Sequence, residues 1–234
     1  MDHSAPQNHI QRRFVRHGFT LIELLVVVSI VSLLVSIILP SLKGAKRQAK
    51  EAVCKTNLRS IHLAQTLLLE VRGKFPKLNN DENDGKWQYN YLIYDGRDWE
   101  NLGPLITDKR LLHDPKLLYC PFQTDPFHSF NTSDNPWTPN RGSDTRASYG
   151  RRHLLTGWPL SHFRKNIAIF SDVTHMPKVI RSAHKKGVNA AFLDGHVSWV
   201  SDPGIFTDND LGEPFDLFDN PIVEKIWLAI DRRQ

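Results

Sequence analysis

The first pattern in the sequence is a long apolar run close to its start. From Leu24 to Leu42 there is no charged side chain. At about 1.5 Å per residue, a helix over these positions is roughly 28 Å long, close to the thickness of the hydrocarbon core of a bilayer. The run therefore predicts a helix that crosses a membrane.

Helical spacing continues beyond this run. Apolar residues recur at intervals of three and four or their multiples, at Leu42, Ala45, Ala49, Val53, Ile61, Ala64 and Leu68. Pro40 removes one backbone hydrogen bond and is expected to bend the helix, while Gly73 and Pro76 are expected to end it. We expect one helix of about fifty residues, apolar first and then amphipathic. The alternative is a membrane-spanning helix that ends in a break and is followed by a separate soluble helix.

The remainder of the chain alternates between turns and short strands. Clusters of Asn, Asp, Gly and Pro from Lys74 to Trp158 predict long surface loops. Ile167 to Phe170 predicts one strand, and 188–200 predicts two strands joined by Asp194-Gly195 in a type I′ turn, with Phe192 near opposite Val197. A short helix is expected over Ile222 to Ile230. The predicted fold is α+β: a long N-terminal helix packed on a small antiparallel sheet with long loops.

Composition and charge narrow the possible number of domains, the partners and the cellular location. The chain has 234 residues, of which 40% are hydrophobic and 24% charged, enough for one soluble domain besides the apolar helix. Its formal net charge of +5 is too mild to indicate a nucleic-acid partner. Arg12, Arg13 and Arg16 precede the apolar run, so the positive-inside tendency places this end in the cytoplasm. We expect the part after Leu42 to be periplasmic or extracellular.

Glu23 is a lone carboxylate within the apolar segment that begins at Phe19. A carboxylate in lipid costs several kcal/mol unless it is paired. If the chain is cut after Gly18, the new α-amino group of Phe19 is a cation that can pair with it. Within one helix these two groups lie at the same end in strained geometry, so we expect the partner to be the amine of a neighbouring copy. This arrangement predicts a filament.

The segment G-F-T-L-I-E at 18–23, followed by an apolar helix, resembles the cleavage and methylation segment of type IV pilins and type II secretion pseudopilins. The resemblance implies that Gly18 precedes the cut, that Phe19 is the methylated new terminus and that Glu23 is the assembly carboxylate. Pro40 matches the helix-kinking proline of many such subunits. It also implies three kinds of partner: prepilin peptidase, other pilin or pseudopilin subunits, and an inner-membrane assembly platform.

Two other export signals compete with this interpretation. A secretory signal peptide has an apolar core of roughly 7 to 15 residues, shorter than the run seen here, and no small-x-small site occurs before Lys43. Arg12-Arg13-Phe14 suggests a twin-arginine signal but lacks the usual flanking residues. We therefore expect four segments: a leader (1–18), a transmembrane and assembly helix (19–42), an amphipathic continuation (43–73) and a periplasmic α+β domain (74–234).

The expected function is that of a structural subunit, a pilin or pseudopilin, which starts as a single-pass inner-membrane protein and assembles into a type IV pilus-like or type II secretion filament. No nucleophile motif or phosphate loop is present, so we do not expect an enzyme. The alternative is a surface protein that uses the pilin anchor to present a site for a carbohydrate or DNA. Exposed clustering of Trp87, Trp99 and Trp137 would favour it.

A second resemblance lies in the C-terminal half. His184 is followed after nine residues by Asp194-Gly195, and C-K-T-N-L-R-S-I occupies 54–61, as in pilin-like proteins with a processing-associated H-x9-DG motif. We interpret His184 as a structural lock whose ring folds back to the Asp194 turn. The alternative is a metal ion held by Asp172, His184, Asp194 and His196, because imidazole and carboxylate together suit zinc. Their spacing is no standard ligand pattern.

Two further features of the sequence leave alternatives open. Cys54 and Cys120 form a disulfide that clamps the first helix to the middle loops, or remain two free buried thiols. No cofactor is expected, although an acidic, turn-rich segment has the hard-oxygen character of a calcium site without the EF-hand spacing. Its acidic residues are Asp208, Asp210, Glu213 and Asp216.

Overall fold

A computed structural model describes residues 19–232 except 74, 77–89, 109, 153–160, 162, 165, 173–176, 203 and 205–219, and gives no side-chain placement for 177 and 220–225. The predictions for the leader with Gly18, for Trp87 and for the acidic segment 208–216 lie outside the described residues. The chain divides into two compact units, Met1–Arg47 and Gln48–Gln234.

The helix α1 runs without a break from Leu21 to Arg72. Pro40 lies inside it, so the predicted continuation is confirmed and the alternative of a separate soluble helix is wrong. At the C-terminal end, Gly73 has a φ of +73° and its N–H donates to the carbonyl of Leu69 at 2.7 Å. Glycine adopts this left-handed conformation without a Cβ clash, which explains why the helix ends where the sequence predicted.

The buried face of α1 differs in part from the predicted stripe. Its buried residues are Cys54, Asn57, Leu58, Ile61, Ala64, Gln65, Leu68 and Leu69. Ile61, Ala64 and Leu68 were predicted correctly, whereas Leu42, Ala45, Ala49 and Val53 are exposed. The predicted stripe stepped eight residues from Val53 to Ile61, which at about 100° per residue rotates it by roughly 80°. Cys54 is seven residues from Ile61 and therefore shares its face.

The described residues of the unit Gln48–Gln234 form two antiparallel sheets. The smaller pairs β1 with β2, and the larger has the order β3-β4-β5-β6. The strands are β1 (Leu92–Asp95), β2 (Asp144–Arg146), β3 (Tyr149–Arg151), β4 (Ala168–Asp172), β5 (Gly187–Phe192) and β6 (Val197–Ser201). The shorter helices are α2 (Gly103–Thr107), η2 (Pro115–Leu118), α3 (Pro177–Ala183) and α4 (Asn220–Asp231). The α+β class with an antiparallel sheet is thus confirmed.

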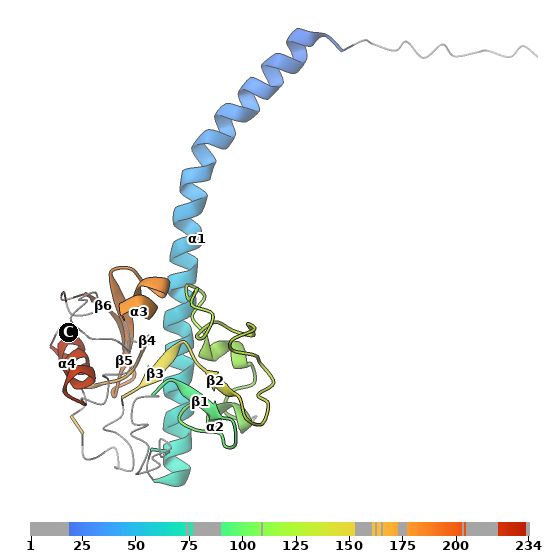
Figure 1. The fold of residues 1–234 in the computed structure, drawn as a ribbon. Coiled ribbons are helices and arrows are strands. Elements are labelled where there is room, and N and C mark those ends of the chain that lie inside the picture. The colour runs from blue at the N-terminus through green and yellow to red at the C-terminus, as the bar shows by residue number, and fades with distance from the viewer. Residues whose placement is uncertain are drawn as a thin grey trace, which may run out of the picture. The chain divides into compact units, whose positions relative to one another are not determined.

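The four-stranded sheet separates two apolar cores, with the C-terminal half of α1 on one side and α4 on the other (Figure 1). Strand β5 shows why: Val188, Ala190 and Phe192 pack in the cluster of α4, whereas Ala191 packs in the cluster of α1. Alternate side chains of a strand point to opposite faces, so a strand covered on both sides is apolar at successive positions.

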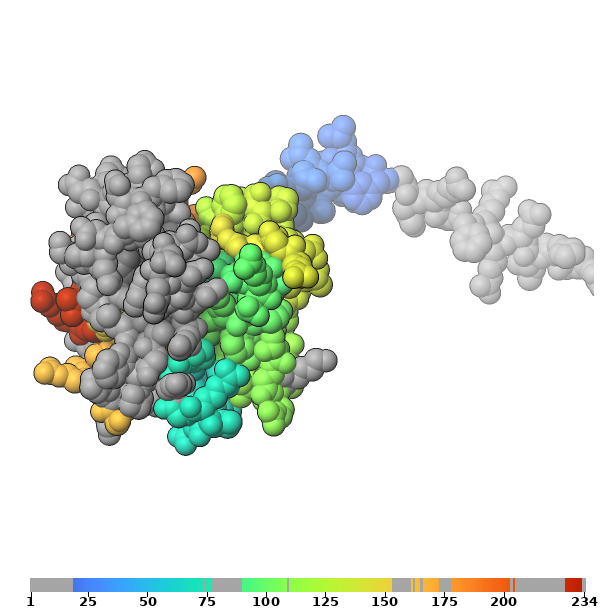
Figure 2. Space-filling view, turned by 60° about the horizontal axis from the view of Figure 1, so that its bottom comes forward, coloured from blue at the N-terminus to red at the C-terminus, as the bar shows by residue number. Residues whose placement is uncertain are grey.

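The segment with β1 and α2 extends the core of α1. In the space-filling view it lies beside the C-terminal end of that helix (Figure 2). Ile93, Leu102 and Leu105 are fully buried in the same cluster as Leu68 and Leu69. Fully burying a side chain of this size stabilises the fold by about 1.5–3 kcal/mol, so these loops are anchored by their apolar residues.

The β5–β6 hairpin corrects the predicted turn. Val197 pairs with Ala191, and the N–H of Phe192 donates to the carbonyl of His196 at 2.9 Å. Gly195 has a φ of +92° and its N–H donates to the carbonyl of Phe192, but Asp194 is not among the residues of positive φ. The loop is therefore a three-residue one closed by a left-handed glycine, not a type I′ turn, and the register is shifted by one residue.

Candidate functional site

The start of α1 is a capping box built from Thr20 and Glu23. The hydroxyl of Thr20 accepts the N–H of Glu23 at 3.3 Å, and the carboxylate of Glu23 accepts the N–H of Thr20 at 2.8 Å. The Thr20 hydroxyl also donates to the carboxylate at 2.7 Å. A reciprocal pair of this kind satisfies backbone N–H groups that a helix start leaves free. Both contacts to the carboxylate use the same oxygen, Oε2.

This local partner was missed in the sequence, although the T-x-x-E spacing that signals it was present. The expectation had been that the charge of Glu23 depends on an amine from another copy. In the structure, Oε2 of Glu23 accepts two hydrogen bonds from Thr20 of the same chain. The second carboxylate oxygen, Oε1, can accept a hydrogen bond from a further donor.

The apolar half of α1 exposes its side chains around the whole helix. Phe19 is 72% exposed and Leu21 80%, and apolar residues down to Leu42 are exposed in the same way. By length and composition this part of the helix is able to cross a membrane. An all-round apolar helix is typical of a segment surrounded by lipid or by other helices.

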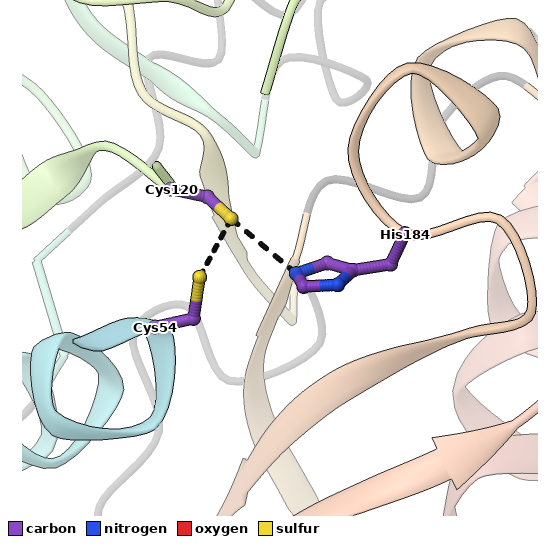
Figure 3. Close-up of side chains that lie close together, drawn as sticks. All are labelled: Cys54, Cys120 and His184. Atoms are coloured by element: carbon purple, nitrogen blue, oxygen red, sulfur yellow. Dashed lines mark hydrogen bonds between the residues drawn. The ribbon is translucent and has the colours of Figure 1, made fainter. Parts of the chain in front are cut away.

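A buried cluster in the second unit joins three segments that lie far apart in the sequence. Cys54 comes from α1, Cys120 follows η2 and His184 follows α3, and their side chains point toward one another (Figure 3). The two Sγ atoms are 2.8 Å apart, and Cys120 Sγ lies 3.3 Å from His184 Nε2. The structure thus places side by side the two cysteines whose state the sequence left open, and both are buried thiols. Burial raises the pKa of the Cys120 thiol.

His184 also faces a buried carboxylate. Its Nε2 lies 3.4 Å from Asp172 Oδ2, at the end of β4. The same oxygen accepts the backbone N–H of Asn189 at 2.6 Å and its side-chain amide at 3.1 Å. Burial raises the pKa of Asp172, against the opposing effect of His184 and Asn189. The other oxygen, Oδ1, is buried and makes no hydrogen bond with the described part of the chain.

Aromatic rings and one lysine hold this cluster in place. The His184 ring lies between Phe122 and Trp199, at centroid distances of 4.8 and 5.4 Å. Lys50 on α1 donates to the carbonyl of Pro121 at 2.9 Å, next to Cys120. The side-chain amide of Asn57 donates to the carbonyl of Tyr119 at 3.2 Å. The loop carrying Cys120 is therefore fixed to α1 on both sides of the thiol.

The four residues of the alternative metal site, Asp172, His184, Asp194 and His196, are not brought together. These residues divide into two pairs at opposite ends of β5, because His184 precedes this strand and Asp194 follows it. Six extended residues at about 3.3 Å each span roughly 17 Å between the strand ends. Asp194 and His196 form an exposed pair, with Oδ1 and Nδ1 at 2.5 Å. The predicted lock between His184 and the Asp194 turn is wrong for the same reason, and the acidic partner of His184 is Asp172.

The two described tryptophans of the proposed aromatic surface pack onto the domain. Trp99 and Trp137 have their ring centroids 6.2 Å apart and are both half-buried. Trp99 also contacts Tyr94 at 5.3 Å, and Trp137 contacts Phe130 at 5.9 Å. Rings in such a chain of contacts hold loops to the core and do not favour an exposed ligand surface.

Comparison with known proteins points to the N-terminal segment. Residues 13–39 match the model of the prokaryotic N-terminal methylation motif. The type IV major pilin protein PilA of Myxococcus xanthus is 33% identical over 64 residues, which cover 27% of this chain and 29% of that protein. The chain thus spans under a third of the length of this curated relative, and no solved structure matches. The N-terminal segment of this chain is thus similar to that of a type IV pilin.

Proposed function

We propose that this chain is a structural subunit that prepilin peptidase cuts after Gly18 and that assembles through α1 into a type IV pilus-like or type II secretion filament. The observation that carries the proposal is the match of residues 13–39 to the methylation motif, on a helix whose apolar side chains are exposed all round. In this role the subunit performs no catalysis.

The precursor is a single-pass inner-membrane protein in this proposal. Arg12, Arg13 and Arg16 hold the leader in the cytoplasm, and α1 crosses the bilayer. The unit Gln48–Gln234 then lies in the periplasm or on the outside of a filament. Assembly moves α1 from lipid to a bundle of like helices, where its exposed apolar surface remains covered.

Glu23 is the assembly carboxylate in this proposal. The capping box engages Oε2, and the α-amino group of Phe19 in a neighbouring subunit approaches the free side of the same carboxylate. This second contact is a charge pair in an apolar environment, which is worth more than the same pair in water. In this proposal Pro40 sets the bend of α1 within its apolar half.

Processing is tested by mass spectrometry of the mature protein. We expect Phe19 as the first residue, carrying a methyl group on its amine. Filament subunits that retain residues 1–18 would refute the cleavage. Co-purification with either a pilus or a secretion assembly platform then distinguishes the two machines.

The role of Glu23 is tested by three variants that separate its charge from its cap. Glu23→Gln keeps an acceptor for Thr20 but loses the charge. Thr20→Val keeps the charge but loses the hydroxyl of the cap. Glu23→Ala loses the charge and the acceptor that the carboxylate supplies to the cap. Filaments sheared from cells are compared by immunoblot with the subunit retained in membranes. We expect Glu23→Gln and Glu23→Ala to insert in membranes and to assemble poorly, whereas Thr20→Val assembles.

The opposite pattern would show that Glu23 only starts the helix. In that case Glu23→Gln would form filaments normally, and Thr20→Val would fail together with Glu23→Ala. Normal assembly of all three variants would remove Glu23 from the mechanism altogether.

A further inference from the structure

We propose that Cys54, Cys120 and His184 bind one zinc ion, which ties α1 to the loops after η2 and α3, with the carboxylate of Asp172 beside the site. The proposal concerns the second unit alone and does not depend on the filament. The four residues come from four separate segments: α1, the loop after η2, the loop after α3 and the end of β4. All four are buried, with at most 5% of each residue exposed.

The donor atoms are those that zinc prefers. Structural zinc sites use thiolate sulfur and imidazole nitrogen, with carboxylate oxygen as a further ligand, in a tetrahedral arrangement. Ligand atoms of Cys54, Cys120 and His184 all lie within 4.8 Å of one another. Asp172 lies outside this group, although its Oδ2 is 3.4 Å from His184 Nε2 and its charge is therefore close to the site. The ligand set is two sulfurs and one nitrogen, which leaves one position of the tetrahedron for a further ligand.

The distances fit a shared ion after a small adjustment. With zinc bonds of about 2.0–2.3 Å, tetrahedral geometry separates neighbouring ligand atoms by roughly 3.3–3.8 Å. The separation of Cys120 Sγ and His184 Nε2, 3.3 Å, falls in this range. The two sulfurs, at 2.8 Å, must move apart by about 1 Å, which modest side-chain rotations of the cysteines can supply.

The residues around this cluster form an outer shell that holds its side chains in position. Asn189 holds Asp172 Oδ2 through its backbone and side-chain N–H groups, and Phe122 and Trp199 fix the plane of the His184 ring. Such contacts orient metal ligands and exclude water. Asp172 Oδ1 is buried without a hydrogen-bond partner in the described part of the chain. A buried orphan oxygen is costly, and a bound cation offsets that cost.

A disulfide between Cys54 and Cys120 explains less of this arrangement. It joins the two sulfurs but gives no role to the imidazole and the carboxylate beside them. Zinc uses both sulfurs and the imidazole, and the buried carboxylate of Asp172 then lies near a cation.

The test measures metal and thiols in the same full-length protein, purified in detergent without chelator from cells supplied with zinc. Elemental analysis should give about one zinc per chain. Intact mass should correspond to two reduced thiols, and alkylation should proceed only after a chelator removes the metal. Cobalt(II) added to the chelator-treated protein should give the absorption bands of a tetrahedral site with sulfur ligands.

Variants assign the ligands. Cys54→Ser, Cys120→Ser and His184→Gln should lose stoichiometric zinc, and Asp172→Asn should bind it about 10–100-fold more weakly. Asp194→Asn and His196→Ala alter the exposed pair at the other end of β5 and serve as matched controls that keep the zinc. If a cysteine variant fails to fold, as judged by near-ultraviolet circular dichroism, cobalt binding to the unmodified chain decides the question.

Two results would overturn the proposal. The first is an intact mass lower by two hydrogens, with thiols that react only after reduction and no bound zinc. The second is zinc whose amount falls as much in His196→Ala as in His184→Gln, which would show adventitious binding at the surface.

Discussion

Removal of the Asp231 carboxylate should loosen α4 from the sheet. Asp231 is the last residue of α4; its Oδ2 accepts Arg152 Nη1 at 2.8 Å and its Oδ1 accepts the backbone N–H of Ala168 at 2.8 Å. The Arg152 side chain is only 5% exposed and that of Asp231 17%. In Asp231→Ala, a buried guanidinium and a backbone N–H at the start of β4 both lose an acceptor.

The expected cost follows from these two losses. Removing one partner of a buried ion pair typically destabilises a protein by about 3–5 kcal/mol. Arg152 has a further interaction and Asp231 is partly exposed, so we take the lower end, about 3 kcal/mol. Asp231→Asn retains one acceptor oxygen and should cost about 1–2 kcal/mol. For a domain of roughly 150–250 residues, 1 kcal/mol lowers Tm by about 2–4 °C, so Asp231→Ala should melt about 6–12 °C lower.

Thermal unfolding of the full chain in detergent, followed by tryptophan fluorescence, measures this shift because Trp227 of α4 is buried between this helix and the sheet. Asp108→Ala is the matched control, since it removes a carboxylate 2.9 Å from an arginine, Arg110, whose side chain is 90% exposed. Surface pairs contribute little, so its Tm should match that of the parent. Equal shifts in both variants, or a parental Tm for Asp231→Ala, would contradict the reasoning.

Two further predictions concern pH and the hairpin. Burial lowers the pKa of His128 from 6.5 to about 4, opposed by its hydrogen bond to the carbonyl of Ala147 and the charge of Asp125 and assisted by that of Arg146. Below pH 6.5 the unfolded chain therefore binds a proton that the folded chain excludes, so the free energy of unfolding should fall by up to about 3 kcal/mol between pH 6.5 and 4. Urea titrations at several pH values should show this dependence on pH. A His128→Gln variant with the same pH dependence as the parent would contradict the assignment. Gly195→Val should lower stability by more than about 1 kcal/mol because φ is +92°, while the space for a Cβ is open to ordinary contact with His62; a parental Tm would show that the loop relaxes instead.

The local elements of this fold were predictable from the sequence. Hydrophobic spacing and Gly73 defined the extent of α1, because both act within a few turns of the same helix. The error along its buried face came from an eight-residue step across which no apolar residue had been placed. Thr20 and Glu23 could also have been recognised, since the capping box depends on a three-residue spacing alone.

The buried cluster was not predictable in the same way. Cys54 and Cys120 are 66 positions apart, and Cys120 and His184 are 64 apart. Their meeting depends on the order of strands in the sheet and on the loop after η2, which no local periodicity encodes. The ten positions from His184 to Asp194 suggested proximity, but the strand between them is extended and carries the two residues apart.

The capping box also bears on the order of events at the membrane. Before cleavage, the first turn of α1 carries only the negative charge of Glu23, next to helix N–H groups that partly compensate it. If the chain is cut after Gly18 as proposed, a positive amine is added one residue before Thr20, and the turn becomes a zwitterion with no net charge. Transfer of a neutral turn into a helical bundle requires less desolvation than transfer of an anion. The proposed cut would thus change the solvation of the helix end as well as the length of the chain before it, and would make the processed form the one whose end can be buried.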